Sequence, residues 1–463
     1  MHAAFTGPAR LSGPAGTGKT VVALHRMARF AKTRPGRLLF TSFVRTLPGY
    51  HRAGFDRLAP RVGERAEFMG LHAWASRFLA WRGVAYRLPR ADEKPYEDAF
   101  ARAWTRARND LAAIEGTDYE YWREEVGRVI EGRGITTLAE YLAIDRPGRN
   151  RIRLGATQRT TVWHRFYLPY RERLAERGID TFHDVIAKAL AEITARPLDH
   201  TEDYGLVVVD EVQDFTLTQL RLAHHIAGGG PNAPLLLVGD GQQQVYAGGW
   251  RLSDAGIPLG GGRGRVLRTN YRNRDAVLRY AQRIEAMDTV DDLDGGPGFA
   301  VRDSDGVLPG GDAVELRVPR TEVDAALLRA VAAVPPGSDI AVLVDGRTAV
   351  RHYLRLLTRA GHDALALEEY DGMEVAAIKV GTVHRAKGMD FAAVFRLVDE
   401  EPDQGDRDRA ELLARQHLVA ASRARDYLWV ATVTGLSAPK SPPRARSSPP
   451  PGRPGRAGPA GAG

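Results

Sequence analysis

The spacing of apolar and polar side chains predicts alternating strands and helices from the start of the chain. Residues 8–12 read as a short strand that leads into a glycine-rich turn. Residues 19–31 carry apolar side chains at helical spacing, and residues 37–41 form a short apolar run after a Pro-Gly break. A strand, a helix and a second strand in this order are typical of a parallel sheet with helices on both faces.

Apolar runs further along the chain predict more strands of the same kind. Residues 206–210 and 235–240 are apolar, and each run ends in an aspartate. From about residue 263 we expect a second α/β unit. Its expected strands cover residues 313–318, 339–344, 376–382, 391–397 and 427–433. Its expected helices lie near residues 274–286, 321–333, 348–360 and 408–421.

Two stretches have a different character. Residues 77–200 are charged, rich in Trp and Tyr and helical in period, so we expect a helical insertion between strands of the first sheet. The final segment is basic and rich in Pro and Gly, and we expect disorder because it has too few large apolar side chains to offset its ordering entropy. The predicted α/β chain has a first lobe at 1–76 and 201–262, an insertion at 77–200, a second lobe at 263–435 and a tail at 436–463.

Composition restricts the functional classes. The 463 residues include no cysteine, which excludes disulfides, thiolate-bound zinc and iron–sulfur clusters. No apolar run is long enough to span a bilayer, and the first residues lack the layout of a signal peptide, so we expect a cytoplasmic protein. The net charge is +8, but the stretch from residue 437 contributes five positive charges and no negative ones. Bulk charge is therefore only weak support for nucleic-acid binding.

A glycine-rich segment between the first expected strand and helix matches the pattern G-x-x-x-x-G-K-[ST]. Its residues are Gly13, Pro14, Ala15, Gly16, Thr17, Gly18, Lys19 and Thr20. In this context the backbone amides form an anion site at the start of a helix. Lys19 is expected on the β- and γ-phosphates of a nucleoside triphosphate, and the Thr20 hydroxyl on Mg²⁺.

A pair of acids ends the valine-rich run near residue 207. Asp210 is placed to hold Mg²⁺, directly or through water. Glu211 is placed to orient and deprotonate the water that attacks the triphosphate. Alone, the pair would read as an exposed acidic turn in about one case in three, but the phosphate loop makes that alternative small.

Further segments complete an ordered set of motifs. They cover residues 210–214, 239–246, 267–273, 380–391 and 419–425, with looser matches at 41–43 and 70–72. Together with the phosphate loop, this set resembles the UvrD/Rep family of superfamily 1 helicases from about residue 8 to about residue 433. The resemblance implies two RecA-like P-loop NTPase lobes that bind ATP and Mg²⁺.

The resemblance also implies roles for individual residues at the nucleotide. Gln243 would contact the γ-phosphate or the attacking water, while Arg272 and Arg423 would reach the γ-phosphate from the second lobe. Tyr271 would stack on adenine, and Asp390 would meet the ribose. Outside a motif, a single arginine is more often part of a surface ion pair.

The same resemblance implies contacts to single-stranded DNA. Phe43 and Tyr246 would stack on bases, and His72, Thr382 and His384 would touch backbone phosphate. Stacking suits a translocase because every base offers a π-face, so binding tolerates any sequence. For Phe43, which follows a core strand, ordinary packing is the alternative.

The sequence departs from the family pattern in several places. Only twelve residues precede Gly13 and none is glutamine, so the family's adenine-reading glutamine motif is not found here. Either the chain is truncated or adenine selectivity rests on Tyr271 alone. Trp250 lies two positions beyond the tryptophan of many relatives, and Asp390 stands where glutamate is usual. Roughly 105 residues separate the fourth motif from the fifth, so we expect the accessory subdomain to be reduced to a loop near residues 368–374.

These observations leave three functional hypotheses. The first is an ATP-dependent DNA helicase or translocase that moves along single-stranded DNA, 3′ to 5′ by the resemblance, in DNA repair or replication restart. The second is a truncated DNA-binding remnant that does not hydrolyse ATP. The third is an ATPase module that serves an effector on another chain, such as a nuclease in a repair complex.

Overall fold

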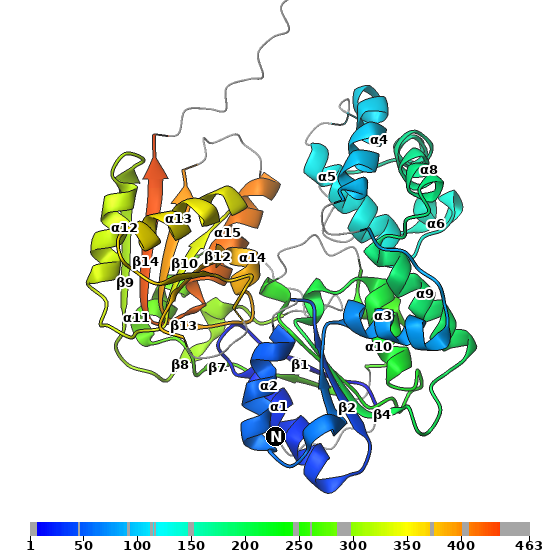
Figure 1. Cartoon of the computed structure of the whole chain (residues 1–463), viewed down its shortest axis with the longest axis horizontal. Coiled ribbons are helices and arrows are strands. Elements are labelled where there is room, and N and C mark those ends of the chain that lie inside the picture. The colour runs from blue at the N-terminus through cyan, green and yellow to red at the C-terminus, as the bar shows by residue number, and fades with distance from the viewer. Residues whose placement is uncertain are drawn as a thin grey trace, which may run out of the picture.

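The computed structural model describes residues 7–44, 47–89, 93–111, 114, 117–146, 152–243, 250–259, 262–284, 298–370, 375–400 and 407–435. These residues form two parallel sheets and a separate group of helices (Figure 1). Tyr246 and the basic tail lie outside the described residues, as does the side chain of Gln243. No helix of this described part is long and apolar enough to cross a membrane.

The first sheet has six parallel strands in the order β3-β2-β4-β5-β1-β6. They are β1 (Ala9–Ser12), β2 (Arg37–Ser42), β3 (Ala66–Phe68), β4 (Tyr204–Asp210), β5 (Leu235–Gly239) and β6 (Gly264–Val266). Because all strands point the same way, the turns after β1, β2, β4 and β5 meet at one edge of the sheet, its carboxyl edge.

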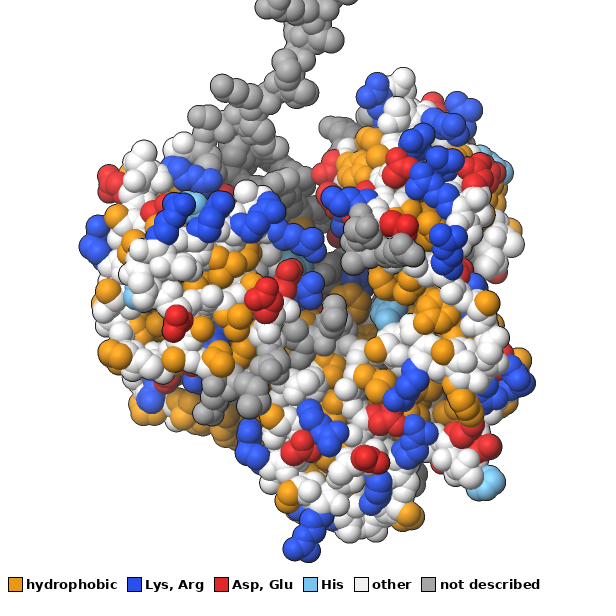
Figure 2. Space-filling view, in the orientation of Figure 1, with side chains coloured by type: hydrophobic (Ala, Val, Ile, Leu, Met, Phe, Trp, Pro, Cys, Tyr) orange, Lys and Arg blue, Asp and Glu red, His pale blue; other side chains and the backbone are white. Residues whose placement is uncertain are grey.

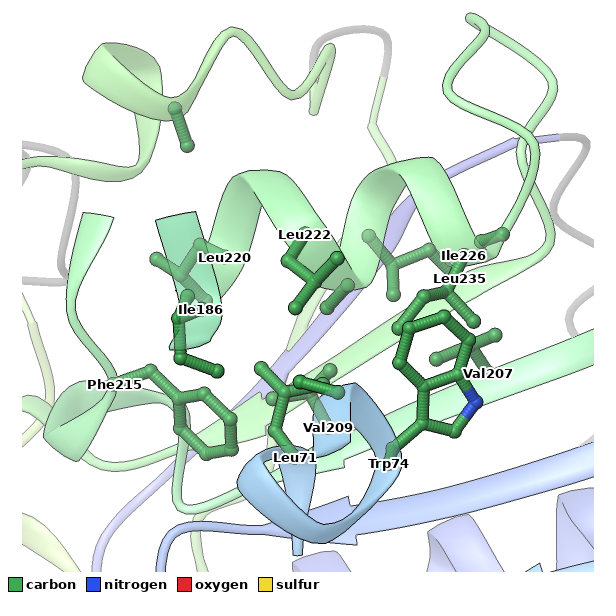
Figure 3. Packing of buried hydrophobic residues seen from close by; sticks show 14 of the residues in the cluster. Leu71, Trp74, Ile186, Val207, Val209, Phe215, Leu220, Leu222, Ile226 and Leu235 are labelled. Atoms are coloured by element: carbon green, nitrogen blue, oxygen red, sulfur yellow. The ribbon is translucent and has the colours of Figure 1, made fainter. Parts of the chain in front are cut away.

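Helices cover both faces of this sheet, which explains its continuous apolar strands. One face carries α1 (Lys19–Thr33) and α2 (Leu47–Leu58), and the other carries α3 (Leu71–Arg82), α9 (Phe182–Ala195) and α10 (Leu217–Ile226). In β4, Val208 packs with the first group, whereas Val207 and Val209 pack with the second (Figure 3). Alternate side chains thus fill two cores, as in a sheet buried on both sides.

The second sheet is also parallel, in the order β11-β12-β10-β13-β14-β9. Its strands are β9 (Asp312–Pro319), β10 (Ile340–Val344), β11 (Ala364–Ala366), β12 (Ile378–Thr382), β13 (Phe391–Asp399) and β14 (Ala424–Thr434). Two apolar clusters cover its faces. One includes residues of α11 (Asp275–Gln282), α14 (Val383–Ala386) and α15 (Arg407–Ala421), and the other residues of α12 (Val323–Ala332) and α13 (Arg347–Arg359). A two-stranded pair, β7 (Thr269–Asn270) and β8 (Asp305–Gly306), belongs to neither sheet.

The helical insertion has an apolar core of its own. It contains α4 (Pro95–Leu111), α5 (Tyr119–Glu124), α6 (Leu138–Ala143), α7 (Ala156–Thr161) and α8 (Leu168–Glu176), with two π-helical segments, η2 (Glu125–Glu131) and η3 (Val162–Tyr167). Its cluster centres on buried aromatic side chains such as Trp122 and Phe166. By contrast, α3 and α9 pack against the first sheet, so the part of the insertion with a separate core lies between them.

The sequence predicted most of these elements. The strands expected at residues 8–12, 37–41, 206–210 and 235–240 are confirmed as β1, β2, β4 and β5. The five strands and four helices expected in the second unit are confirmed within a few residues. The strands that the pattern missed include β3, β6 and β11, which have three residues each and are too short to show a period.

The two lobes share apolar and backbone contacts. Ala15, Val44 and Leu47 of the first lobe belong to the same apolar cluster as the core of the second sheet. A methyl group added at Gly388 would lie 2.4 Å from a methyl carbon of Leu47, so the Leu47 side chain packs directly on the backbone of Gly388. The phosphate loop is therefore fixed against the second lobe as well as the first.

Paired phenylalanine substitutions test the separate core of the insertion. Phe166 is fully buried, whereas Phe182 is 51% exposed. Phe166→Ala should lower the free energy of unfolding by about 3–5 kcal/mol, because it removes a buried ring and leaves a cavity. Phe182→Ala should lower it by less than about 1 kcal/mol. Urea denaturation measures both, and equal losses in the two variants would contradict the assigned core.

Candidate nucleotide-binding site

The turn between β1 and α1 is shaped for close approach of backbone to an anion. Gly16 and Gly18 have φ angles of 79° and 77°, in the left-handed region that favours glycine. A Cβ atom added at Gly16 would lie 2.5 Å from the side-chain nitrogen of Asn270. A side chain at position 16 is therefore excluded both by conformation and by space.

Lys19, at the first position of α1, bends back over this loop. Its Nζ donates to the carbonyl oxygens of Gly13 at 2.7 Å and Pro14 at 2.9 Å. The same atom lies 3.9 Å from a carboxylate oxygen of Asp240, at the end of β5. Burial lowers the pKa of Lys19, and the nearby carboxylates of Asp240 and Glu211 act in the opposite direction. The amine thus lies where the phosphate loop meets the acids of the carboxyl edge.

Thr20 and Asp210 place two oxygen ligands side by side. The Thr20 hydroxyl donates to the Asp210 carboxylate at 3.0 Å across the sheet edge. Burial and the neighbouring Glu211 carboxylate together raise the pKa of Asp210 to about 7. A hydroxyl and a desolvated carboxylate suit Mg²⁺, which is commonly bound by one or two protein oxygens together with substrate phosphates. No group of three or more His, Asp or Glu side chains that could hold a metal occurs in the described part of the chain.

Glu211 is held in an unusual conformation. Among the described residues it is the one non-glycine residue with a positive φ, 54°. Burial alone would raise the pKa of its carboxyl, but Lys387, Lys19 and Arg423 together lower it. The carboxylate is thus kept ionised at the carboxyl edge of the sheet. A backbone outlier stabilised by its surroundings in this way is typical of a functional position.

Gln213 joins the ends of β4 and β5, a role that the sequence did not predict. Its side-chain nitrogen donates to the Glu211 carboxylate, and its side-chain oxygen accepts from the backbone N–H of Asp240 at 3.0 Å. Gln213 is almost fully buried, so both hydrogen bonds are shielded from water. It therefore fixes the position of Glu211 relative to Asp240.

An ion pair between the lobes was also missed. Lys387, from the turn after α14, donates to both carboxylate oxygens of Asp214, at 2.6 and 2.8 Å. The same Nζ lies 4.0 Å from Glu211, and both partners of the pair are buried. The only signal in the sequence was that Lys387 is one of the few lysines and lies within a motif.

On the second lobe, Asp390 joins two arginines. Arg272 Nε lies 3.3 Å from one oxygen of the Asp390 carboxylate, and Arg425 donates to the other oxygen at 2.9 Å. Although burial raises the pKa of Asp390, Arg272 and Arg425 outweigh it and keep the carboxyl ionised. The residues expected at the ribose and at the γ-phosphate therefore form a pair.

Arg423 is almost fully buried, at 1% exposure. Its guanidinium donates to the carbonyl oxygens of Val419 and Met389 and to the Ser422 hydroxyl. Burial and the nearby Arg272 together lower the pKa of Arg423 to about 10. Glu211 acts on it in the opposite direction, so this cation of the second lobe lies within electrostatic range of the acids of the first.

Tyr271 lies beside the phosphate loop with its ring in solvent. Its backbone N–H donates to the carbonyl oxygen of Gly16 at 2.9 Å, and the residue is 64% exposed. The ring is thus near the loop and accessible to a planar partner. Its role at adenine stays a prediction.

Among the described residues expected to contact DNA, Phe43 of the first lobe and His384 of the second lie near the insertion. The Phe43 ring packs against Phe215, with centroids 6.2 Å apart, and the Arg128 guanidinium lies 5.1 Å from its centroid. Arg128 belongs to η2 of the insertion and also acts electrostatically on His384. Thr382 ends β12 one residue before α14. Phe43 is half-buried, and its ring contacts agree with the packing that the alternative interpretation predicted.

Two histidines expected to contact DNA, His72 and His384, are uncharged at neutral pH. Burial lowers the pKa of His72 to about 4, and burial together with Lys387 lowers that of His384. A phosphate contact from either side chain would therefore be a hydrogen bond and not an ion pair. Trp250 lies elsewhere, in the core of the first lobe, where its indole N–H donates to the Phe215 carbonyl at 2.8 Å.

Two parallel α/β lobes that meet at a glycine-rich phosphate loop define the class of RecA-like P-loop proteins. Residues 141–259 match the family model for the UvrD/REP helicase N-terminal domain. This match includes β4, which ends in Asp210, the following Glu211, and β5. The chain therefore contains a UvrD-like helicase domain. No curated protein matches the chain in a sequence search.

The raised pKa of Asp210 predicts a pH dependence of stability. Its carboxyl titrates near pH 4 in the unfolded chain and near 7 in the fold, so the fold binds an extra proton between these values. Stability should therefore fall as the pH rises through this interval. Asp210→Asn removes the titration, so its free energy of unfolding should increase relative to wild type from pH 5 to pH 8. Denaturation at both pH values without nucleotide measures this, and a pH-independent difference would contradict it.

Proposed function

We propose that this protein is an ATP-dependent motor that moves along single-stranded DNA, 3′ to 5′, in DNA repair or replication restart. The observation that carries the proposal is the meeting of both lobes at one group of buried charges. Lys19, Asp210 and Glu211 come from the first lobe, and Arg423 acts on Glu211 from the second. The UvrD-like helicase domain supports the same conclusion.

In the proposed reaction, water attacks the γ-phosphorus of ATP and ADP leaves. The loop amides and Lys19 bind the β- and γ-phosphates. Thr20 and Asp210 would hold Mg²⁺, which would neutralise negative charge on the phosphates. Gln243 orients the water. Glu211 accepts its proton, which suits a carboxylate that neighbouring cations keep ionised.

The second lobe completes this proposed site. Arg272 and Arg423 stabilise the charge that develops on the transferred phosphoryl group, Asp390 meets the ribose and Tyr271 stacks on adenine. In the described structure Arg272 is paired with Asp390, so phosphate binding requires it to shift its contacts. Such a shift couples the state of the nucleotide to the relative position of the lobes.

The proposed DNA track runs over both lobes. Phe43 and Tyr246 stack on bases, and His72, Thr382 and His384 hydrogen-bond to backbone phosphate. Arg128 ties the insertion to this track, because its guanidinium donates to the Asp214 carbonyl at 2.6 Å and also lies over Phe43. Asp214 is in turn paired with Lys387 of the second lobe, so DNA contacts and catalytic acids share one connected group.

Substitution of the proposed base tests the chemistry. Glu211→Gln should keep ATP binding but lower DNA-stimulated kcat by about 10²- to 10⁴-fold, because a general base is lost. Lys19→Ala should weaken nucleotide binding itself, which titration with a fluorescent ATP analogue measures. Glu64→Gln, on an exposed turn, is the matched control and should leave kcat unchanged. Near wild-type turnover in Glu211→Gln would remove this residue from the mechanism.

A second assay tests the motor activity and its direction. Single-stranded DNA should raise the ATPase rate, and duplex with a 3′ tail should be displaced in preference to duplex with a 5′ tail. DNA binding without phosphate release would favour the non-hydrolysing remnant. Stimulated ATPase without displacement of either duplex would favour translocation without unwinding, or a module that serves an effector on another chain.

A further inference from the structure

A chain of buried amide hydrogen bonds begins at the phosphate loop. Asn270 donates from Nδ2 to the carbonyl oxygen of Ala15 at 3.1 Å and to Oδ1 of Asn273 at 2.9 Å. Its own Oδ1 accepts from the backbone N–H groups of Arg272 at 3.0 Å and Asn273 at 2.9 Å. Both donors and both acceptor positions of this amide are used, so its orientation is fixed.

The chain continues to the segment that carries Arg423. Asn273 donates from Nδ2 to the carbonyl oxygens of Ser422, at 3.2 Å, and Ala424. These two carbonyls flank Arg423 on either side. Asn270 and Asn273 are 0% and 1% exposed, so water does not compete for any of these hydrogen bonds.

This arrangement links elements of different lobes. Ala15 belongs to the loop after β1 of the first sheet, and Ala424 begins β14 of the second. The Arg272 backbone is held by the same Asn270 side chain, so both arginines proposed at the γ-phosphate are held by one pair of amides.

We propose that Asn270 and Asn273 are positioning residues that fix Arg423 and Arg272 relative to the phosphate loop. The inference rests on the proposed ATPase function and adds to it a rigid connection between the phosphate loop and the two arginines. Displacement of a catalytic group by about 1 Å can cost about 10²-fold in rate. Loss of the connection should therefore lower kcat while ATP binding by the loop persists.

A double-mutant cycle separates positioning from general stability. Asn273→Ala should lower DNA-stimulated kcat by about 10- to 100-fold, with KM for ATP changed less than about threefold. In an Arg423→Ala background the same substitution should cause little further loss of kcat, because its effect passes through Arg423. The midpoint of thermal unfolding should fall equally in both backgrounds. The exposed Asn232→Ala is the matched control and should leave kcat unchanged.

Asn273→Asp is the second variant, because it keeps the shape and the acceptor but loses both donors to the flanking carbonyls. It should reproduce the loss of kcat. If wild-type protein hydrolyses ATP but the Asn273 and Arg423 effects multiply independently, the positioning role is overturned while the proposed function stands. If wild-type protein shows no ATPase activity, the proposed function fails and the inference fails with it.

An independent observation concerns the outer face of α13. Its four arginines follow one another at intervals of four residues, and all are exposed: Arg347, Arg351, Arg355 and Arg359. Among the described residues, none of the four forms a hydrogen bond or an ion pair. Figure 2 shows a row of basic side chains over the part of the second lobe where Figure 1 places α13. Like charges at this spacing destabilise a helix. The burial of Tyr353 and Leu357 on the opposite side of α13 offsets this loss of stability.

The row starts at the proposed DNA track. The last residue of β10, Val344, is paired with Thr382, so α13 begins at the same sheet edge as that proposed phosphate contact. The four arginines span about 18 Å along the helix axis, which is enough for several phosphates of one strand. We infer that this arginine row binds the backbone of single-stranded DNA that continues from the track.

The salt dependence of DNA binding tests this surface. Replacing all four arginines by Gln should reduce the slope of log K against log salt for single-stranded DNA by up to ~3, at roughly 0.7 per phosphate contact. Replacing them by Lys should preserve the slope. The matched control replaces four exposed cations at the far ends of α1 and α2, Lys32, Arg34, Arg57 and Arg61, by Gln. A slope change no larger than the control's, or a change seen only with duplex DNA, would overturn the assignment.

Discussion

The compensation of buried charge at the junction of the two lobes is the constraint on which the rest of the site depends. Asp210, Glu211 and Asp214 are carried into the junction by β4 and the turn after it, and all three are almost fully buried. Carboxylates removed from water are costly unless cations lie close to them. Those cations include Lys387 and Arg423, which belong to the second lobe. Neither lobe can therefore hold its half of the junction without the other.

This dependence explains how one molecule in the junction can affect both lobes. Lys19 now lies on carbonyl oxygens of its own loop, and Arg272 lies against Asp390. A triphosphate with its metal is a stronger partner for both cations than these contacts are. In a desolvated site, each exchange of partners has a larger electrostatic effect than it would have in water. Under the proposed function, nucleotide binding would therefore exchange a contact within each lobe for a contact to one ligand that both lobes share.

Local features of the chain were readable from sequence, whereas contacts between distant segments were not. The valines of β4 predict a buried strand, and the glycines before α1 predict an anion-binding loop. Both predictions depend only on the spacing of residues that are close in sequence. The Lys387–Asp214 pair joins residues 173 positions apart, and the Asn273–Ala424 contact joins residues 151 positions apart. The periodicity of apolar side chains along the sequence does not predict contacts between residues so far apart. Trp250 shows the same limit, since only the fold reveals that it packs in the core.

The most direct test of the account is a structure with Mg²⁺ and a non-hydrolysable ATP analogue bound. We expect the loop amides and Lys19 to surround the β- and γ-phosphates, and the guanidinium groups of Arg272 and Arg423 to lie within hydrogen-bonding distance of the terminal phosphate. If Arg272 stays on Asp390, and Arg423 on the Met389 carbonyl, while the analogue occupies the loop, the two lobes do not complete one site and the motor interpretation is contradicted.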